Sequence, residues 1–147
     1  MMYNVLEIAN KIIAKGCEDA NNGGELISNM KLQKLLYYMQ GFHLAYFDEP
    51  LFNEEIEAWM YGPVVPVMYE YFQGYDNNGI TYDGEVISLM PKEERLFNDV
   101  FRVYGKFSAI GLMNLTHKES PWAQTPTGHG NVISKEKLKV FFKTRLR

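Results

Sequence analysis

The sequence predicts a mainly α-helical protein: a single compact domain of five or six helices around a central helix, with a small two-stranded β element. Three features lead to this prediction. Residues 28–47 form a long apolar segment without proline, several other segments repeat apolar residues every three or four positions, and residues 55–60 alternate. With 147 residues, 46% of them hydrophobic, the chain can bury a core. We therefore expect residues 1–147 to form one domain.

The central helix is expected over residues 28–47. Ser28 suits its N-cap, because a serine hydroxyl can accept a hydrogen bond from a first-turn amide. A helix that is apolar nearly all round belongs at the centre of a domain. Such side chains cover most of its circumference, with Leu32, Leu35, Leu36, Met39, His43 and Tyr46 on one face and Tyr37, Tyr38, Phe42 and Phe47 on the other.

A first helix is expected over residues 2–15, where apolar residues from Val5 to Ile13 form one stripe. Gly16 fits the left-handed position that closes a helix. Residues 18–25 contain Asn-Asn-Gly-Gly, which predicts a flexible loop before the central helix.

The middle of the chain carries the β element. Alternation over residues 55–60 predicts a short strand, which Gly62-Pro63 breaks. A helix should then start between Pro63 and Pro66 and end at Gly74. Asp83-Gly84, within residues 80–89, is a two-residue hairpin signal, although its flanks alternate poorly.

The C-terminal third predicts three more helices. One begins at Pro91 and ends at Gly105, and a short one is capped by Ser108. Residues 124–131 are rich in Thr, Gly and Pro and predict a loop. Ser134 can cap a last helix whose apolar residues Leu138, Phe141 and Phe142 point inward.

Composition excludes several classes of site. Cys17 is the single cysteine, so an intrachain disulfide framework and a Cys-rich zinc site are absent. His43, His117 and His129 lack the spacing of metal ligands, and no glycine-rich nucleotide motif or Gly-x-Ser-x-Gly occurs. We expect no metal and no cofactor. Without a visible signal peptide or an apolar run long enough for a membrane span, we expect a cytoplasmic protein.

Charge is spread unevenly along the chain. Residues 134–147 carry six basic residues and one acidic residue, a local charge of +5. Because the whole chain carries −3, the remaining residues carry −8. A basic tail on an acidic body can mark a nucleic acid or acidic protein partner, but a solvated helix face is the interpretation we prefer.

Residues 31–38, near the start of the central helix, are the first candidate for a functional segment. Lys31, Gln33, Lys34 and Tyr37 lie there among leucines and can form a polar edge that contacts a partner. Since charged helix faces are usually solvated, we prefer a solvent-exposed flank.

Residues 58–66 are the second candidate and join the predicted strand to the next helix. Gly62 and Pro63 favour a sharp corner. Trp59 and Tyr61 can cover this corner or serve as anchors at a protein interface. A buried structural corner is the interpretation we prefer.

Residues 116–122 are the third candidate and the most enzyme-like. His117 titrates near neutrality, and Glu119 can pair with it as an acid or base. The His-x-Glu order also opens the zinc-deaminase signature, but the required Pro-Cys-x-x-Cys does not follow. We prefer a structural role, in which His117 ends the preceding helix and Trp122 fills the core.

Five motifs occur in an order that resembles a known family. They are Ile8-Ala9-Asn10, KLQKLLYY at 31–38, Pro50-Leu51-Phe52, Glu57-Ala58-Trp59 with Tyr61-Gly62-Pro63-Val64, and Thr116-His117 with Pro121-Trp122. The set resembles the Panacea antitoxin domain, also known as the SocA-like, phage-associated domain, over residues 4–142. Residues 143–147 form a basic extension outside it.

The resemblance implies a helical bacterial or prophage protein that neutralises a toxin encoded next to it by direct protein binding. Toxins differ widely between members, and one member resembles an adapter that delivers its toxin to a protease. The family brings no established catalytic residues to this chain. The identity of the toxin, the binding surface and the oligomeric state stay open.

Two alternatives to a protein-binding antitoxin also stay open. One is a small enzyme that uses His117 and Glu119 to reverse toxin chemistry. The other is a DNA-binding autorepressor, which rests on the basic tail alone. No helix-turn-helix is recognisable and the acidic body opposes a polyanion, so we expect no nucleic-acid partner.

Overall fold

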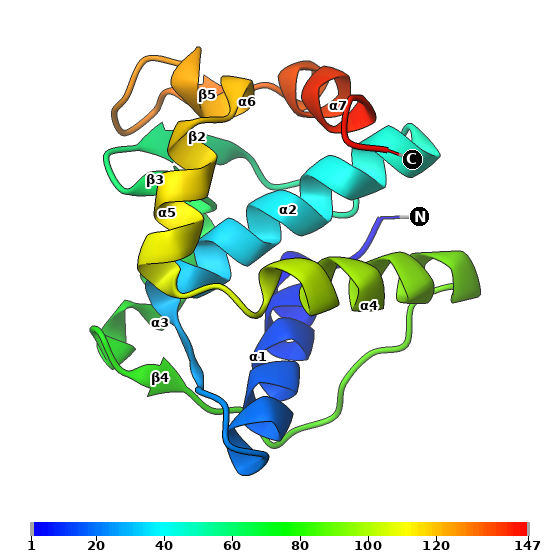
Figure 1. The fold of residues 1–147 in the computed structure, drawn as a ribbon, viewed down its shortest axis with the longest axis vertical. Coiled ribbons are helices and arrows are strands. Elements are labelled where there is room, and N and C mark those ends of the chain that lie inside the picture. Colours follow the sequence, from blue (N-terminus) through cyan, green and yellow to red (C-terminus); the bar gives the residue numbers. More distant parts are fainter. Residues whose placement is uncertain (1, 147) are drawn as a thin grey trace.

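A computed structural model describes residues 2–146, and its fold is mainly helical, as predicted (Figure 1). Its helices are α1 (Val5–Asn21), α2 (Asn29–Phe47), α3 (Pro66–Phe72), α4 (Pro91–Tyr104), α5 (Ala109–His117), α6 (Ser120–Ala123) and α7 (Lys135–Lys143), with a 3-10 turn at Gln73–Tyr75. Its strands are β1 (Ile27–Ser28), β2 (Ile56–Trp59), β3 (Gly62–Val64), β4 (Gly79–Ile80) and β5 (Val132–Ile133).

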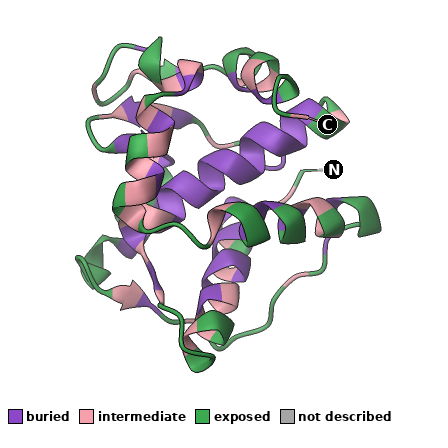
Figure 2. Ribbon diagram, in the orientation of Figure 1, coloured by how far each residue is buried: buried purple, intermediate pink, exposed green. Residues whose placement is uncertain are grey.

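Helix α2 lies at the centre of the molecule, and the prediction of a central helix is confirmed (Figure 1). The Ser28 hydroxyl accepts a hydrogen bond from the Lys31 amide at 3.2 Å, which caps the helix as expected. Buried residues follow each other almost without a break along α2 (Figure 2). Tyr46, in the last turn, is an exception and is 52% exposed.

Helix α7 packs closely along α2, and Gly41 makes this possible. A Cβ atom at position 41 would lie 2.2 Å from the ring of Phe142, so any larger residue would push the two helices apart. Leu138 and Phe142 are buried at this contact as predicted, whereas Phe141 is half-buried. The C-terminal helix is therefore part of the core.

The β structure is larger than predicted. Gly62-Pro63 does not end the sheet, because it begins the returning strand β3, which pairs antiparallel with β2. Strand β5 adds to the other edge of β2 and gives three strands in the order β3-β2-β5. Helix α3 begins only at Pro66, at the C-terminal end of the predicted interval.

The hairpin predicted at Asp83-Gly84 is wrong. Ile80 pairs instead with Ile27, far away in the sequence, as part of the two-stranded β1-β4 sheet. Residues 81–90 contain no helix or strand. The buried partner strand supplied by β1 outweighs a local turn signal whose flanks alternate poorly.

Helix α1 continues beyond Gly16 to Asn21, so the predicted helix end is also wrong. Gly16 serves a different purpose, since a Cβ there would lie 2.5 Å from the side chain of Ile27. The predicted loop over residues 18–25 shortens accordingly. The short helix α6 and strand β5 are additions that the sequence patterns did not predict.

Candidate functional site

A pocket of about 890 Å³ opens between α2, the β2–β3 hairpin and α3. Gln33 and Lys34 of the first candidate segment line it together with Trp59 and Tyr61 of the second. The other lining residues are Asn29, Met30, Val64, Tyr69, Gln73, Asp76 and Asn77. Two segments that were chosen separately from the sequence therefore meet in one cavity.

Lys34 is a lysine in the middle of the central helix, and it is only 1% exposed. Within residues 2–146 its ammonium group forms no hydrogen bond or ion pair. Because burial disfavours the charged form, the pKa of Lys34 falls to about 7. The predicted solvent-exposed flank is wrong for this residue, and also for the buried Gln33 and Tyr37, because the hairpin and α6 cover that side of the helix.

The backbone at Gly62 lies against the Lys34 side chain. A Cβ at position 62 would be 2.7 Å from Lys34 Cε and 3.1 Å from Thr116 Oγ1. Gly62 also has φ of +114°, a conformation that side-chain-bearing residues rarely adopt. Both conditions require glycine at the start of β3.

Hydrogen bonds from α2 hold the wall of the pocket in place. Gln33 Nε2 donates to Asn29 Oδ1 at 2.8 Å, and its Oε1 accepts from the Val65 amide at 2.9 Å. Asn29 Nδ2 donates to the Tyr69 carbonyl oxygen at 3.0 Å. These buried amides tie the central helix to the hairpin and to α3, so the pocket is built on rigid elements.

Aromatic side chains surround the pocket, and we call Trp59, Tyr61 and Tyr69 the aromatic rim. Trp59 meets Tyr69 edge to face at 5.2 Å and stacks on His129 at 3.9 Å. Tyr61 is 59% exposed, so the predicted buried corner holds for Gly62 and Pro63 but not for Tyr61. The hairpin turn and α3 with its 3-10 turn expose further large side chains, namely Met60, Val67, Tyr71 and Tyr75.

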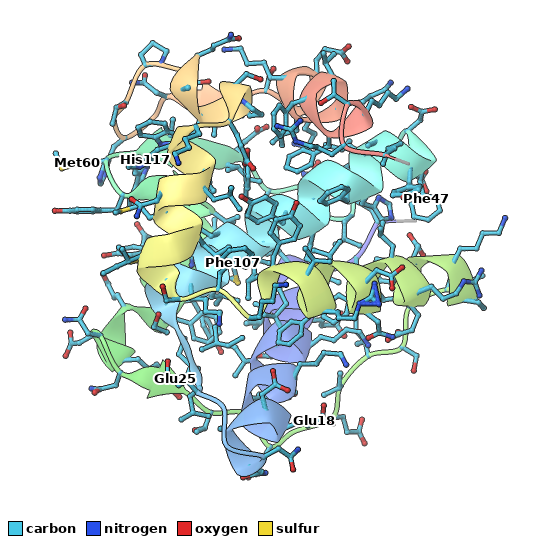
Figure 3. All side chains as sticks on the ribbon, in the orientation of Figure 1. Glu18, Glu25, Phe47, Met60, Phe107 and His117 are labelled. Atoms are coloured by element: carbon cyan, nitrogen blue, oxygen red, sulfur yellow. The ribbon has the colours of Figure 1, made fainter. Side chains whose placement is uncertain are left out.

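Figure 3 places Met60 at the outer edge of the molecule, with His117 beside it. The His117 ring stacks on Trp122 at 3.9 Å, and Trp122 Nε1 donates to the Trp59 carbonyl oxygen at 2.8 Å. Burial lowers the pKa of His117, and the charge of Lys34 acts in the same direction against a backbone hydrogen bond with Met60. His117 Nε2 is buried and has no hydrogen-bond partner within residues 2–146.

Glu119 and His117 contact different residues. Its carboxylate accepts hydrogen bonds from the hydroxyls of Tyr37 at 2.9 Å and Tyr38 at 3.1 Å. Burial raises the pKa of Glu119 to about 7, against the effect of the two tyrosines. No hydrogen bond or ion pair joins Glu119 to His117 among the described residues. The geometry thus gives no support to an acid–base pair.

Lys31 does not reach the pocket. Its ammonium group donates to the Gly105 carbonyl oxygen at 2.6 Å, at the C-terminal end of α4. Burial lowers the pKa of Lys31, while the charges of Glu25 and Asp19 oppose this. The residues of the predicted polar edge therefore lie in three different places. Gln33 and Lys34 line the pocket, Tyr37 bonds to Glu119, and Lys31 bonds to the end of α4.

Sequence reasoning missed two groups of polar residues. Asn29, Tyr69 and Asp76 complete the pocket, and the tyrosine-rich composition of α3 was the available signal. A buried network also surrounds His43, whose ring nitrogens lie 2.6 Å from Glu93 Oε2 and from the Glu49 carbonyl oxygen. That network links α2 to α4 inside the core, away from the pocket.

The basic residues of α7 contact the body of the protein. Lys139 and Lys143 both pair with Asp48, at 3.2 and 3.4 Å, and Lys135 lies 3.6 Å from Glu55. The prediction that solvent alone accounts for these lysines is wrong, because acidic residues of the body pair with them. Arg147 of the predicted basic tail lies outside the described residues.

Residues 2–146 contain no group of three or more His, Cys, Asp or Glu side chains that could hold a metal ion. Within the same residues, no helix has the length and apolar character needed to cross a membrane. The candidate site is the pocket that Lys34 and the aromatic rim line.

These features define a small helical protein with an aromatic-rimmed pocket. The family model for the antitoxin SocA-like, Panacea domain matches residues 32–123. This range contains Lys34, the aromatic rim and residues 117–122, and it is narrower than the span suggested by the motifs. The chain belongs to this SocA-like, Panacea domain family.

The chain is also similar to antitoxin SocA of Caulobacter vibrioides (strain NA1000 / CB15N). The two are 34% identical over 117 residues, which cover 71% of this chain and 62% of that protein. The match therefore spans less than two thirds of the relative's length. No solved structure matches the chain.

Proposed function

We propose that this protein is an antitoxin that neutralises a cognate toxin protein in the cytoplasm by binding it directly. Membership of the Panacea domain family and the similarity to antitoxin SocA support this role. The toxin is expected to be encoded by the neighbouring gene.

The structural feature that carries this proposal is the exposed aromatic surface around the pocket. Tyr and Trp are enriched among the residues that contribute most to protein–protein affinity. Tyr61 and Met60 are exposed at the hairpin turn, and Tyr71 is exposed on α3. A folded protein gains little from leaving so many large side chains in water, whereas a partner would bury them.

A matched pair of variants tests where the toxin binds. Tyr61→Ala removes an aromatic side chain from the pocket rim, and Tyr46→Ala removes one of similar exposure from the end of α2. We expect Tyr61→Ala to weaken binding to the product of the neighbouring gene by about tenfold or more. Tyr46→Ala should bind like the wild type. Equal affinities for both variants would place the interface elsewhere.

Co-expression in a bacterial host tests neutralisation itself. Growth should stop when the neighbouring gene is expressed alone and recover when this protein is expressed with it. The amount of toxin in rescued cells distinguishes two mechanisms: sequestration leaves it constant, and delivery to a protease lowers it. If the neighbouring gene is not toxic, or if no rescue occurs, the proposal fails.

A further inference from the structure

The floor of the pocket holds a buried lysine whose charge has no partner within residues 2–146. Lys34 lines the cavity although it is almost completely removed from solvent. An ammonium group that is buried without an acceptor costs free energy, so evolution rarely places one in a core helix for stability alone. An anion that enters the pocket would supply the missing acceptor.

Nearby polar groups do not meet this need. The Gln33 side-chain oxygen accepts from the Val65 amide, and Thr116 Oγ1 donates to the Met113 carbonyl oxygen at 2.9 Å, but neither forms a hydrogen bond with Lys34 Nζ. The Gly62 backbone comes close to the Lys34 side chain but forms no hydrogen bond with its ammonium group. The ammonium group of Lys34 is thus left without an acceptor among the described residues, on a side chain that lines the cavity.

The charges around the pocket disfavour an anion with more than one negative charge. Lys34 is the one cation among the lining residues, and Asp76 is the one acid. Phosphate groups often bind through arginine clusters, and no arginine is among the lining residues. A carboxylate carries a single charge and suits a single ammonium group.

The surroundings favour a carboxylate that belongs to a protein. Trp59, Tyr61 and Tyr69 form the rim, and exposed apolar side chains continue beyond it on the hairpin turn and on α3. A free carboxylic acid would fill the cavity and leave this outer surface in water. A central charged contact enclosed by aromatic residues is instead the arrangement of a protein interface, in which the ring of side chains excludes water.

We propose that this pocket receives an aspartate or glutamate side chain of the toxin, whose carboxylate pairs with the ammonium group of Lys34 inside the aromatic rim. This inference rests on the proposed function, because it requires a toxin that binds to the protein. In this proposal, Lys34 contributes to affinity for the toxin rather than to the stability of the fold. Stability and binding should therefore respond in opposite directions when the charge is removed.

The test compares Lys34→Met with Lys31→Met. Methionine keeps the apolar stem of lysine and removes the charge, and Lys31 is a second lysine of α2 that lies outside the pocket and has a partner in Gly105. Affinity for the product of the neighbouring gene is measured by calorimetry, and the melting temperature of each free variant is measured alongside. We expect Lys34→Met to weaken binding by about 30-fold or more without a lower melting temperature. Lys31→Met should change affinity by less than about threefold.

A scan of the toxin identifies the partner residue. Each Asp is changed to Asn and each Glu to Gln, and the resulting proteins are tested against wild type and Lys34→Met. Substitution at one toxin position should weaken binding to the wild type and cause no further loss of affinity for Lys34→Met. Sodium benzoate serves as a free carboxylate probe, with the combined fluorescence of Trp59 and Trp122 as the readout, and it should not bind at millimolar concentration.

Different results would overturn different claims. If the toxin binds the wild type and Lys34→Met equally well, the carboxylate contact is wrong and the proposed function stands. Tight benzoate binding that depends on Lys34, with unchanged toxin affinity, assigns the pocket to a small acid and overturns the protein contact. If the wild type neither binds nor neutralises the toxin, both proposals fail. A Lys34→Met protein that melts at a much lower temperature and binds normally once folded makes Lys34 structural.

Discussion

Trp122 Nε1 donates a hydrogen bond of 2.8 Å to the carbonyl oxygen of Trp59, so the two tryptophans join motifs that are 63 residues apart in the chain. Trp59 ends strand β2 and belongs to the aromatic rim, whereas Trp122 lies in α6 and stacks on His117. The bond anchors the hairpin that carries the rim to the helical body. The family motifs at both positions therefore have a shared structural purpose.

Lys34 should make stability depend on pH above neutrality. Its pKa is lowered from 10.5 to about 7, so between these values the unfolded chain binds a proton that the folded protein has released. Folding is therefore penalised at low pH, and the penalty is relieved as pH rises from about 7 to 10.5. We expect the stability of wild type relative to Lys34→Met to rise by up to about 1.4 kcal/mol per pH unit in this window. Urea unfolding of both proteins at several pH values measures this; parallel curves would contradict it.

Glu119 should make folding stability fall, rather than rise, with increasing pH, and at lower pH values than Lys34. Burial raises its pKa from 4.5 to about 7, so the folded protein keeps a proton that the unfolded chain has lost. Its contribution to stability is complete below pH 4.5 and is lost as pH rises through about 7. In Glu119→Gln this slope should disappear, while Tyr37 keeps a hydrogen-bond acceptor. Equal pH dependence of the two proteins between pH 4.5 and 7 would refute the assignment.

The central helix should dominate stability. Leu35 and Leu36 are both fully buried in the core around α2. We expect Leu35→Ala or Leu36→Ala to lower the free energy of unfolding by about 2–5 kcal/mol, because each leaves a cavity. Tyr46→Ala at the exposed end of the same helix is the control and should cost much less. Denaturant titration gives all three values, and an unchanged midpoint for the leucine variants would remove α2 from the centre of the core.

His117 should matter for folding rather than for chemistry. Its ring stacks on Trp122, and replacement by alanine removes that contact. We expect His117→Ala to lower the melting temperature, and toxin neutralisation should fall only as far as folding does. Rescue of growth is measured together with the amount of folded protein. A stable His117→Ala protein that no longer protects cells would revive the enzymatic alternative.

The last four residues should be dispensable for neutralisation. Lys139 and Lys143 pair with Asp48 within the body, so removal of residues 144–147 leaves these pairs in place. We expect little change in growth rescue and no specific DNA binding by the full-length protein. A gel shift with the promoter fragment at two salt concentrations checks the second point, since phosphate contacts weaken steeply with salt. Retention of that fragment, lost on the deletion, would show that the basic tail binds DNA.

Local sequence patterns predicted the helices well because each pattern arises within one element. Ser28, Ser108 and Ser134 all cap the helices that they were expected to cap, through bonds to amides three residues later. Errors arose where a distant segment decided the outcome. Ile80 found its partner in Ile27 rather than across the Asp83-Gly84 turn, and Gly16 accommodates Ile27 rather than ending α1.

The sequence by itself determined that a helix apolar on nearly all sides must lie at the centre, because only burial satisfies such a surface. It also named Lys34, Trp59 and Tyr61 as residues of interest, but it placed the lysine in solvent. Only the tertiary structure decided that the β2–β3 hairpin covers Lys34 and that an aromatic rim surrounds it. The physical reason is that burial of a polar side chain depends on which distant segment packs over it, and helical periodicity contains no information about that segment.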